Sequence, residues 1–395
     1  MTGRTATTRH FRERWRMTVE ARALVLISAC MLAFGFATLY SASAIVAMQE
    51  YMGSAYFLQR QLQGAALGIV VFAIAAKWDA ERWSRVAWPL MILTMFLMLL
   101  TVLPFTEGIA PRIHGSRRFL VGGSLQPSEL AKLSVIVWTS MLVVKKGDGG
   151  LRRLSRGLMP FIVVVGSLGI LALLEPDLSA TMMFFLVMSV ILFSAGARIG
   201  HFVFLAVAGI PLLWGQMQRL QYTLLRMASF LDPGFTQENL NYQLKQSLIA
   251  VGSGGAFGLG FGQGRQQYGF LPFAYNDFIG SNIGEEWGFV GLATLVVAWA
   301  AWGWLGFRIS KQARTPFQKY VGVGLTFTML VTAYLHIGVV IGLLPTTGLT
   351  LPFVSFGRSN LILSMLMTGI LANIGSIRER VYHDGATDPL ERVAA

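Results

Sequence analysis

The sequence predicts an all-α integral membrane protein with about ten transmembrane helices and one large extracytoplasmic loop between the seventh and eighth helices. Three observations lead to this fold class. Of the 395 residues, 54% are hydrophobic and only 13% are charged, whereas a soluble chain carries about 25% charged residues. Apolar runs of about 20 residues, enough to cross a bilayer as a helix, recur along the chain. Lys and Arg are concentrated in alternate connecting segments, as the positive-inside rule requires.

The predicted spans are the apolar segments that follow a basic N-terminal segment, residues 1–21. They cover residues 22–47, 61–77, 87–103, 127–145, 159–174, 179–195, 199–217, 280–306, 320–343 and 353–375. The alternation of Lys and Arg requires an even number of crossings, with both ends in the cytoplasm. We therefore expect a transmembrane domain over 22–375 and a cytoplasmic tail over 376–395.

Composition also bears on other functional classes. The net charge of +13 is explained by basic loops at the inner surface, so it does not indicate nucleic-acid binding. The single Cys30 cannot form a disulfide framework and is interpreted as a small packing residue. The sequence contains no His, Cys, Asp and Glu spacing typical of a structural zinc site.

Several basic residues fall on the outer side, where the positive-inside rule does not account for them. They are Arg60, Arg112, Arg117, Arg118, Lys132, Arg219, Arg226, Lys245, Arg265 and Arg358. An anionic ligand on this side would explain them. Contact with solvent or with lipid headgroups is the alternative for each one.

The outer segment 218–279 is the one long stretch between spans. Loops beyond about 15 residues are usually functional or disordered, and the Tyr, Phe and Leu throughout this one argue against disorder. Its middle has leucines near helical spacing, at Leu240, Leu244 and Leu248, which predicts a helix at the outer membrane surface. The glycine-rich run GSGGAFGLGFGQG lies outside, so it is interpreted as flexible or closely packed backbone and not as a phosphate loop.

The segment QPSELAKL, residues 126–133, begins the fourth span. Glu129 and Lys132 are three residues apart and therefore share one helix face. Ionisable groups inside spans are costly and indicate a functional site. The pair is either a structural feature of a helix start or a charged pair at the floor of an outward-facing site.

The segments FLPFAYNDFIGSNIGEEWG and GLLPTTGLTLPFVSFGRSN, residues 270–288 and 342–360, flank the last three spans. Asp277 is the one acid between Glu238 and Glu285, and at the membrane boundary it is a candidate general base. A helix cap is its alternative role. The second segment is irregular backbone that must line protein or a water-filled cavity. Nearby His336 is expected to be a hydrogen-bonded core residue.

Together these segments resemble the SEDS family of membrane glycosyltransferases, which includes RodA, FtsW and SpoVE. QPSELAKL resembles the family motif on the fourth span, and EPDLSAT at 175–181 resembles its EPDLG turn. The long outer segment, GEEWGFVG and GLLPTTGLTLPFVSFGRSN resemble the family's large loop, its GEELGFIG pattern and its G-LP-TG-LPF-SYGGSS element. The order and spacing agree over roughly residues 20–380. The segment TTGLTLP is more similar to the FtsW branch of the family.

The resemblance implies a peptidoglycan glycosyltransferase that polymerises lipid II on the outer face of the bacterial cytoplasmic membrane, in cell division or elongation. It places the catalytic carboxylate at Asp277, where it would take a proton from the acceptor hydroxyl. Glu129 and Lys132 match the family's supporting pair. The remaining candidates for substrate or pyrophosphate contact are Arg118, Lys245, Gln246 and Arg358.

The chain departs from the family pattern near these residues. Phe273 stands where the family has glutamate, and Tyr275, Asn276, Arg358 and Asn360 also differ. The alternative functions are a lipid II flippase, which would also bind a lipid pyrophosphate in a polar cavity, and a non-catalytic scaffold for a transpeptidase, which these departures favour. The implied partners are a class B penicillin-binding protein and other membrane proteins of the divisome or elongasome. The resemblance implies no definite cofactor. A divalent metal, Mg²⁺ or Mn²⁺, would assist the reaction, but the sequence shows no recognisable set of metal ligands.

Overall fold

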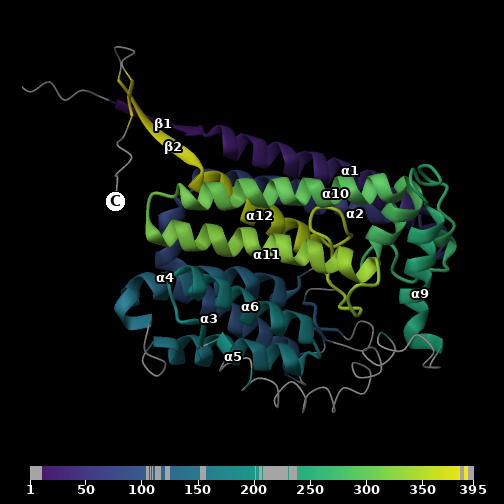
Figure 1. Cartoon of the computed structure of the whole chain (residues 1–395), viewed down its shortest axis with the longest axis horizontal. Helices are drawn as coiled ribbons and strands as arrows, with labels where there is room; N and C mark the ends of the chain where they lie inside the picture. The colour runs from purple at the N-terminus through teal and green to yellow at the C-terminus, as the bar shows by residue number, and fades with distance from the viewer. Residues whose placement is uncertain are drawn as a thin grey trace, which may run out of the picture.

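The computed structural model in Figure 1 describes most of the chain. The described residues are 11–103, 106, 108, 110–111, 117–120, 125–151, 157–200, 202–203, 207, 230, 238–382 and 387–389. The first half contains α1 (Val19–Gln49), α2 (Tyr56–Lys77), the 3₁₀ turn η1 (Ala80–Arg82), α3 (Trp83–Val102), α4 (Pro127–Leu151), α5 (Met159–Leu174) and α6 (Leu178–Ser194). The second half contains α9 (Glu238–Ser253), the 3₁₀ turn η4 (Gln266–Tyr268), α10 (Ile279–Lys311), α11 (Pro316–Val340) and α12 (Arg358–Ile374).

The chain is a multi-pass membrane protein. Six of the described helices are long and apolar enough to cross a membrane, and α5 and α6 are shorter apolar helices. Their outer faces expose large apolar side chains, such as Ile74 at 58%, Ile92 at 61% and Val297 at 65%. A water-soluble protein would bury these side chains, whereas lipid accommodates them.

Each predicted span within the described residues coincides with a helix. The span predicted at 199–217 lies largely outside the described residues. The helix predicted in the outer segment is α9. Its Ser247 is buried, whereas Leu248 is 44% exposed. In Figure 1, α9 runs across one end of the bundle, almost perpendicular to the long helices.

The helices lie side by side with small residues at their contacts. In Figure 1, α1, α10, α11 and α12 run together, and α3, α4, α5 and α6 form the adjoining part of the bundle. At one contact, a Cβ on Gly306 of α10 would lie 2.5 Å from Thr326 Oγ1 of α11. Only glycine permits such an approach, as is common between membrane helices. The largest fully buried side chains are Trp138, Trp299 and Trp302.

A small sheet, absent from the all-α prediction, joins the two tails. Strand β1 (Phe11–Met17) pairs antiparallel with β2 (Ser376–Tyr382), which pairs antiparallel with β3 (Thr387–Pro389). At the membrane end of the sheet, Thr18 Oγ1 donates to the Gly375 carbonyl at 2.8 Å. This pairing puts the start of α1 and the end of α12 on the same side of the bundle, as an even number of crossings requires.

Candidate active site

Asp277 lies two residues before the start of α10, on a segment held by the connection between α11 and α12. The Phe356 N–H donates to the Tyr275 carbonyl at 3.0 Å. The Ser355 hydroxyl donates to the Asn276 carbonyl at 2.7 Å. The N-cap of α10 is Phe278, whose side chain makes no capping hydrogen bond. The α11–α12 connection therefore holds the backbone just before Asp277, and Asp277 is not the N-cap residue of α10.

The Asp277 carboxylate faces the backbone of Gly348. A Cβ built on Gly348 would lie 3.7 Å from Asp277 Oδ2, and Gly348 has φ +70°. The positive φ favours glycine, and a side chain at this position would lie against the carboxylate. The Ser179 hydroxyl at the start of α6 donates to the neighbouring Thr347 carbonyl at 2.8 Å. The irregular connection is thus anchored to the start of α6, next to the residue that faces Asp277.

His336 of α11 contacts both the α11–α12 connection and the start of α10. The structure leaves this side chain 1% exposed, and its Nδ1 lies 2.8 Å from the Leu349 carbonyl. The Gly280 N–H donates to Nε2 at 3.3 Å. Both contacts fit a neutral ring with the proton on Nδ1. The prediction of a hydrogen-bonded core histidine is confirmed, while its bridging position was not evident from sequence.

Polar and aromatic groups surround Asp277. The Asn276 Oδ1 and Thr347 Oγ1 atoms are buried without a hydrogen-bond partner, so both can bind a polar substrate group or water. The Tyr275 ring packs between Phe57 and Phe356, at centroid distances of 4.5 Å and 6.0 Å. Burial raises the pKa of Tyr275, and the charges of Glu50 and Asp277 raise it further. Its phenol therefore keeps its proton at neutral pH.

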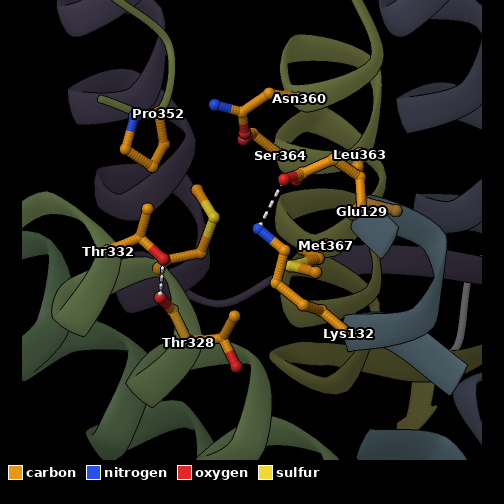
Figure 2. A pocket seen from close by; sticks show the side chains of 10 residues that line it. Glu129, Lys132, Thr328, Thr332, Pro352, Asn360, Leu363, Ser364 and Met367 are labelled. Carbon is orange, nitrogen blue, oxygen red and sulfur yellow. Dashed lines mark hydrogen bonds and ion pairs between the residues drawn. The ribbon is translucent and has the colours of Figure 1, made fainter. Parts of the chain in front are cut away.

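A second polar group lies in a pocket between α4, α11 and α12 (Figure 2). The Lys132 Nζ and Glu129 Oε1 atoms are 2.7 Å apart, and their side chains are 8% and 12% exposed. The predicted pair is therefore formed. Asn360 also lines this pocket and donates to the Thr350 hydroxyl. The other lining residues are Thr328, Met329, Thr332, Pro352, Leu363, Ser364 and Met367.

The α11–α12 connection links this pocket to Asp277. Gly348 faces the Asp277 carboxylate, and Pro352 lines the pocket around the ion pair. Four residues of extended chain span at most about 14 Å. One short segment therefore borders both Asp277 and the pocket around the ion pair.

Arg118, which precedes α4 in the sequence, lies against the turn between α5 and α6. Its guanidinium donates to the Glu175 carbonyl at 3.1 Å and to the Pro176 carbonyl, and it lies 4.0 Å from Asp177 Oδ2. The carboxylate of Asp177 accepts the Ala180 N–H at 3.0 Å and caps α6. Arg118 thus orders this turn, and its side chain remains 33% exposed.

The other predicted contact residues lie on α9 and α12. Lys245 is exposed and Gln246 is half-buried on α9. On the packed face of that helix, Ser247 donates to the Val340 carbonyl at 2.8 Å. Arg358 begins α12, and its Cγ would lie 3.1 Å from a Cβ built on Gly64 of α2. Asn360, but not Arg358, is among the residues that line the pocket around the ion pair.

The glycine-rich segment fits into a break in α10 at Gly288, which has φ +66°. On the N-terminal side of this break, the carbonyls of Glu285 and Glu286 accept the N–H groups of Leu259 and Gly260, at 2.9 and 3.0 Å. A Cβ on Gly258 would lie 2.1 Å from the Glu286 carbonyl. The segment is therefore closely packed backbone, one of the two predicted interpretations. Within the described residues, no group of three or more His, Cys, Asp or Glu is placed to hold a metal ion.

Comparison with known proteins gives a consistent result. The family model for cell cycle proteins of the FtsW, RodA and SpoVE type matches residues 21–380. A probable peptidoglycan glycosyltransferase FtsW of Trichlorobacter lovleyi is 34% identical and aligns over 92% of this chain and 95% of its own. Stage V sporulation protein E of Bacillus subtilis is 35% identical and aligns over 89% and 95%.

Two solved structures share the fold. One, described as a peptidoglycan synthase complex that coordinates polymerization and crosslinking, aligns with TM-score 0.72 at 24% identity over 89% of this chain and 96% of its own. The rod shape determining protein RodA of Thermus thermophilus aligns with TM-score 0.63 at 24% identity, over 89% and 95%.

Proposed function

Because the chain belongs to the FtsW, RodA and SpoVE family of cell cycle proteins, we propose that it is a peptidoglycan glycosyltransferase. It polymerises lipid II into glycan strands on the outer face of the cytoplasmic membrane. The observation that carries the proposal is the position of Asp277, the one acid between residues 239 and 284. Its carboxylate faces Gly348, on the segment that also borders the buried ion pair.

The proposed reaction transfers the growing glycan from its lipid carrier to the acceptor sugar. Asp277 accepts the proton of the acceptor hydroxyl as that oxygen attacks the anomeric carbon of the donor. The bond from the anomeric carbon to the pyrophosphate oxygen breaks, and the lipid pyrophosphate departs. Positive charge favours this departure, and Lys132, Arg118, Lys245 and Arg358 are the proposed sources.

The proposed topology follows the distribution of charge. Both tails are cytoplasmic, since they carry clustered Arg and pair with one another in the β1–β2 sheet. The Asp277 end of the bundle then faces outward. A transpeptidase of the class B penicillin-binding type is the proposed partner, supported by the fold shared with a complex described as coordinating polymerization and crosslinking.

Replacement of Asp277 by Asn tests this function. The amide keeps nearly the same shape but cannot accept a proton, so glycan synthesis from lipid II should fall by about 10²–10⁴-fold. The matched control is Asp79→Asn, because Asp79 binds the Glu81 N–H at η1, which lies beside Asn373 at the C-terminal end of α12, away from Asp277. Glycan chains would be resolved on a gel with matched amounts of stable protein. Wild-type chains from Asp277→Asn would favour a flippase or a scaffold.

A further inference from the structure

Three oxygen-bearing side chains in the first turns of α10 converge on one buried point. Asn282, Glu285 and Glu286 are each 1% exposed. A Cβ built on Gly264 would lie 3.0 Å from Glu285 Oε2, 3.3 Å from Glu286 Oε1 and 3.4 Å from Asn282 Oδ1. Adjacent residues of a helix normally point about 100° apart. Here both carboxylates reach the same face of the glycine-rich segment.

These two carboxylates have few donors. Glu285 accepts the backbone N–H groups of Arg265 and Gln266, at 2.8 and 3.2 Å. Glu286 Oε1 accepts the Ser41 hydroxyl of α1, and the backbone of Gly262 also hydrogen-bonds to Glu286. Within the described residues, no Lys, Arg or His forms an ion pair with either glutamate. Two adjacent acids are therefore buried without a compensating cationic side chain.

Several polar atoms of these residues, and of Gln266, whose backbone N–H binds Glu285, are unsatisfied. Glu286 Oε2, both amide atoms of Asn282, and Gln266 Oε1 are buried without a hydrogen-bond partner. Neither amide atom of Asn282 reaches hydrogen-bond geometry with a neighbouring group. Buried polar atoms without partners indicate a missing ion or water. Two buried charges of the same sign are also costly by several kcal/mol per ion.

We propose that Asn282, Glu285 and Glu286, with Ser41 and Gln266, form a binding site for one hard divalent cation. Carboxylate, amide and hydroxyl oxygens are the ligands that Ca²⁺, Mg²⁺ and Mn²⁺ prefer. A divalent charge balances both carboxylates, whereas a shared proton balances only one. The site is built from α1, the glycine-rich segment and α10, so the cation holds these three together.

The cation is structural and not part of the glycosyl transfer. Glu285 follows Ile279, the first residue of α10, by six residues, which is about 9 Å along the helix axis, and Asp277 precedes Ile279 by two more residues. The site instead fixes the chain that leads to Asp277, because Glu285 binds the backbone of Arg265 and Gln266. Bound cation should therefore stabilise the segment between η4 and α10.

Binding of Mn²⁺ to the full-length protein in non-ionic detergent, without lipid II, tests the site. Electron paramagnetic resonance measures free Mn²⁺, and a thermal unfolding midpoint measures stabilisation. We expect saturable binding of one Mn²⁺ per chain, competition by Ca²⁺ or Mg²⁺, and a higher midpoint. Glu286→Gln should weaken binding about tenfold or more. Glu20→Gln, which alters a carboxylate paired with Arg308 elsewhere on α1, should bind Mn²⁺ like the wild type.

A second variant keeps the proposal testable if Glu286→Gln does not fold. Gly264→Ala retains both carboxylates and places a methyl group against the three oxygens, so it should also weaken binding. The absence of stoichiometric Mn²⁺ binding, or equal binding by both variants, would overturn the proposal. Stabilisation by acid alone, with no effect of divalent cations, would overturn it in favour of a shared proton.

Discussion

The hydroxyl of Ser355 donates to the carbonyl of Asn276 at 2.7 Å and accepts the N–H of Leu351 at 2.9 Å. One buried side chain therefore joins the residue before Asp277 to the turn that begins α12. It satisfies two backbone groups that would otherwise lack partners. This contact makes the position of the proposed base depend on the α11–α12 connection.

Ser355→Ala should lower polymerisation without unfolding the protein. Loss of the hydroxyl leaves the Asn276 carbonyl and the Leu351 N–H unsatisfied, at a cost of about 1–3 kcal/mol. Asp277 would then be held less firmly, so the rate at saturating lipid II should fall. The buried Ser43→Ala is the control, since its hydroxyl bonds only to Leu39 of its own helix. Equal rates for both variants would contradict the positioning role.

Gly348→Val should block access to Asp277. The site of the new side chain is 3.7 Å from the carboxylate, so the two methyl groups would occupy space needed by the acceptor sugar. The positive φ adds roughly 1–2 kcal/mol of strain. Gly196→Val is the control, because Gly196 has φ +83° and no atom within 4 Å of its Cβ position. Both variants should lose similar thermal stability, but only Gly348→Val should lose glycan synthesis.

Replacements of Glu129 and of Lys132 should have strongly coupled effects on thermal stability. Removing Lys132 alone leaves a carboxylate that is only 12% exposed, and breaking a buried pair costs about 3–5 kcal/mol. Lys132→Ala and Glu129→Ala should each lower the thermal midpoint, whereas the double variant should lose less than the sum. Polymerisation should fall in all three. Wild-type synthesis by a folded Lys132→Ala protein would reject a functional role for the pair.

The apolar runs predicted the bundle because the bilayer fixes the length of each helix. The span expected at 159–174 is α5, with the same bounds. The ion pair was predictable for a similar reason, since a spacing of three residues puts two side chains on one helix face. In both cases, local periodicity determines the contact.

The contacts that shape the site depend instead on residues far apart in the sequence. His336 binds the Gly280 N–H across 56 residues, and no periodic pattern marks such a partner. The hydrogen bond from the Gly260 N–H to the Glu286 carbonyl was likewise hidden, because glycine-rich sequence fits both flexible and packed loops. Strand β1 escaped prediction because FRERWRM is highly charged, and its pairing is with the opposite end of the chain.

Arg358→Gly should weaken lipid II binding more than it lowers protein abundance. Arg358 begins α12, where the helix dipole disfavours a positive charge, so an anionic ligand beside it would offset this cost. KM for lipid II should rise, and Arg358→Lys should recover part of the loss by restoring the charge. Unchanged kinetics across substrate concentrations would show that Arg358 only contacts lipid headgroups.

Glu175, in the turn after α5, should make stability depend on pH. Burial raises its pKa to about 8; the hydrogen bond from Thr101 lowers the pKa, while the charge of Asp177 raises it and that of Arg118 lowers it. The Thr101 hydroxyl also lies 2.6 Å from the Met98 carbonyl. A single hydroxyl proton cannot serve both acceptors. A protonated Glu175 can instead donate to the Thr101 hydroxyl oxygen, which leaves the Thr101 proton for the Met98 carbonyl.

The sign of the effect follows from the raised pKa. The folded state holds the Glu175 proton more tightly than the unfolded chain, whose value is near 4.5. Stability is therefore full below pH 4.5 and falls as the pH rises toward about 8. Glu175→Gln mimics the protonated acid, so this variant should match the wild type in acid and exceed its thermal midpoint above pH 8. Parallel midpoint curves for the two proteins between these limits would show that Glu175 does not titrate on unfolding.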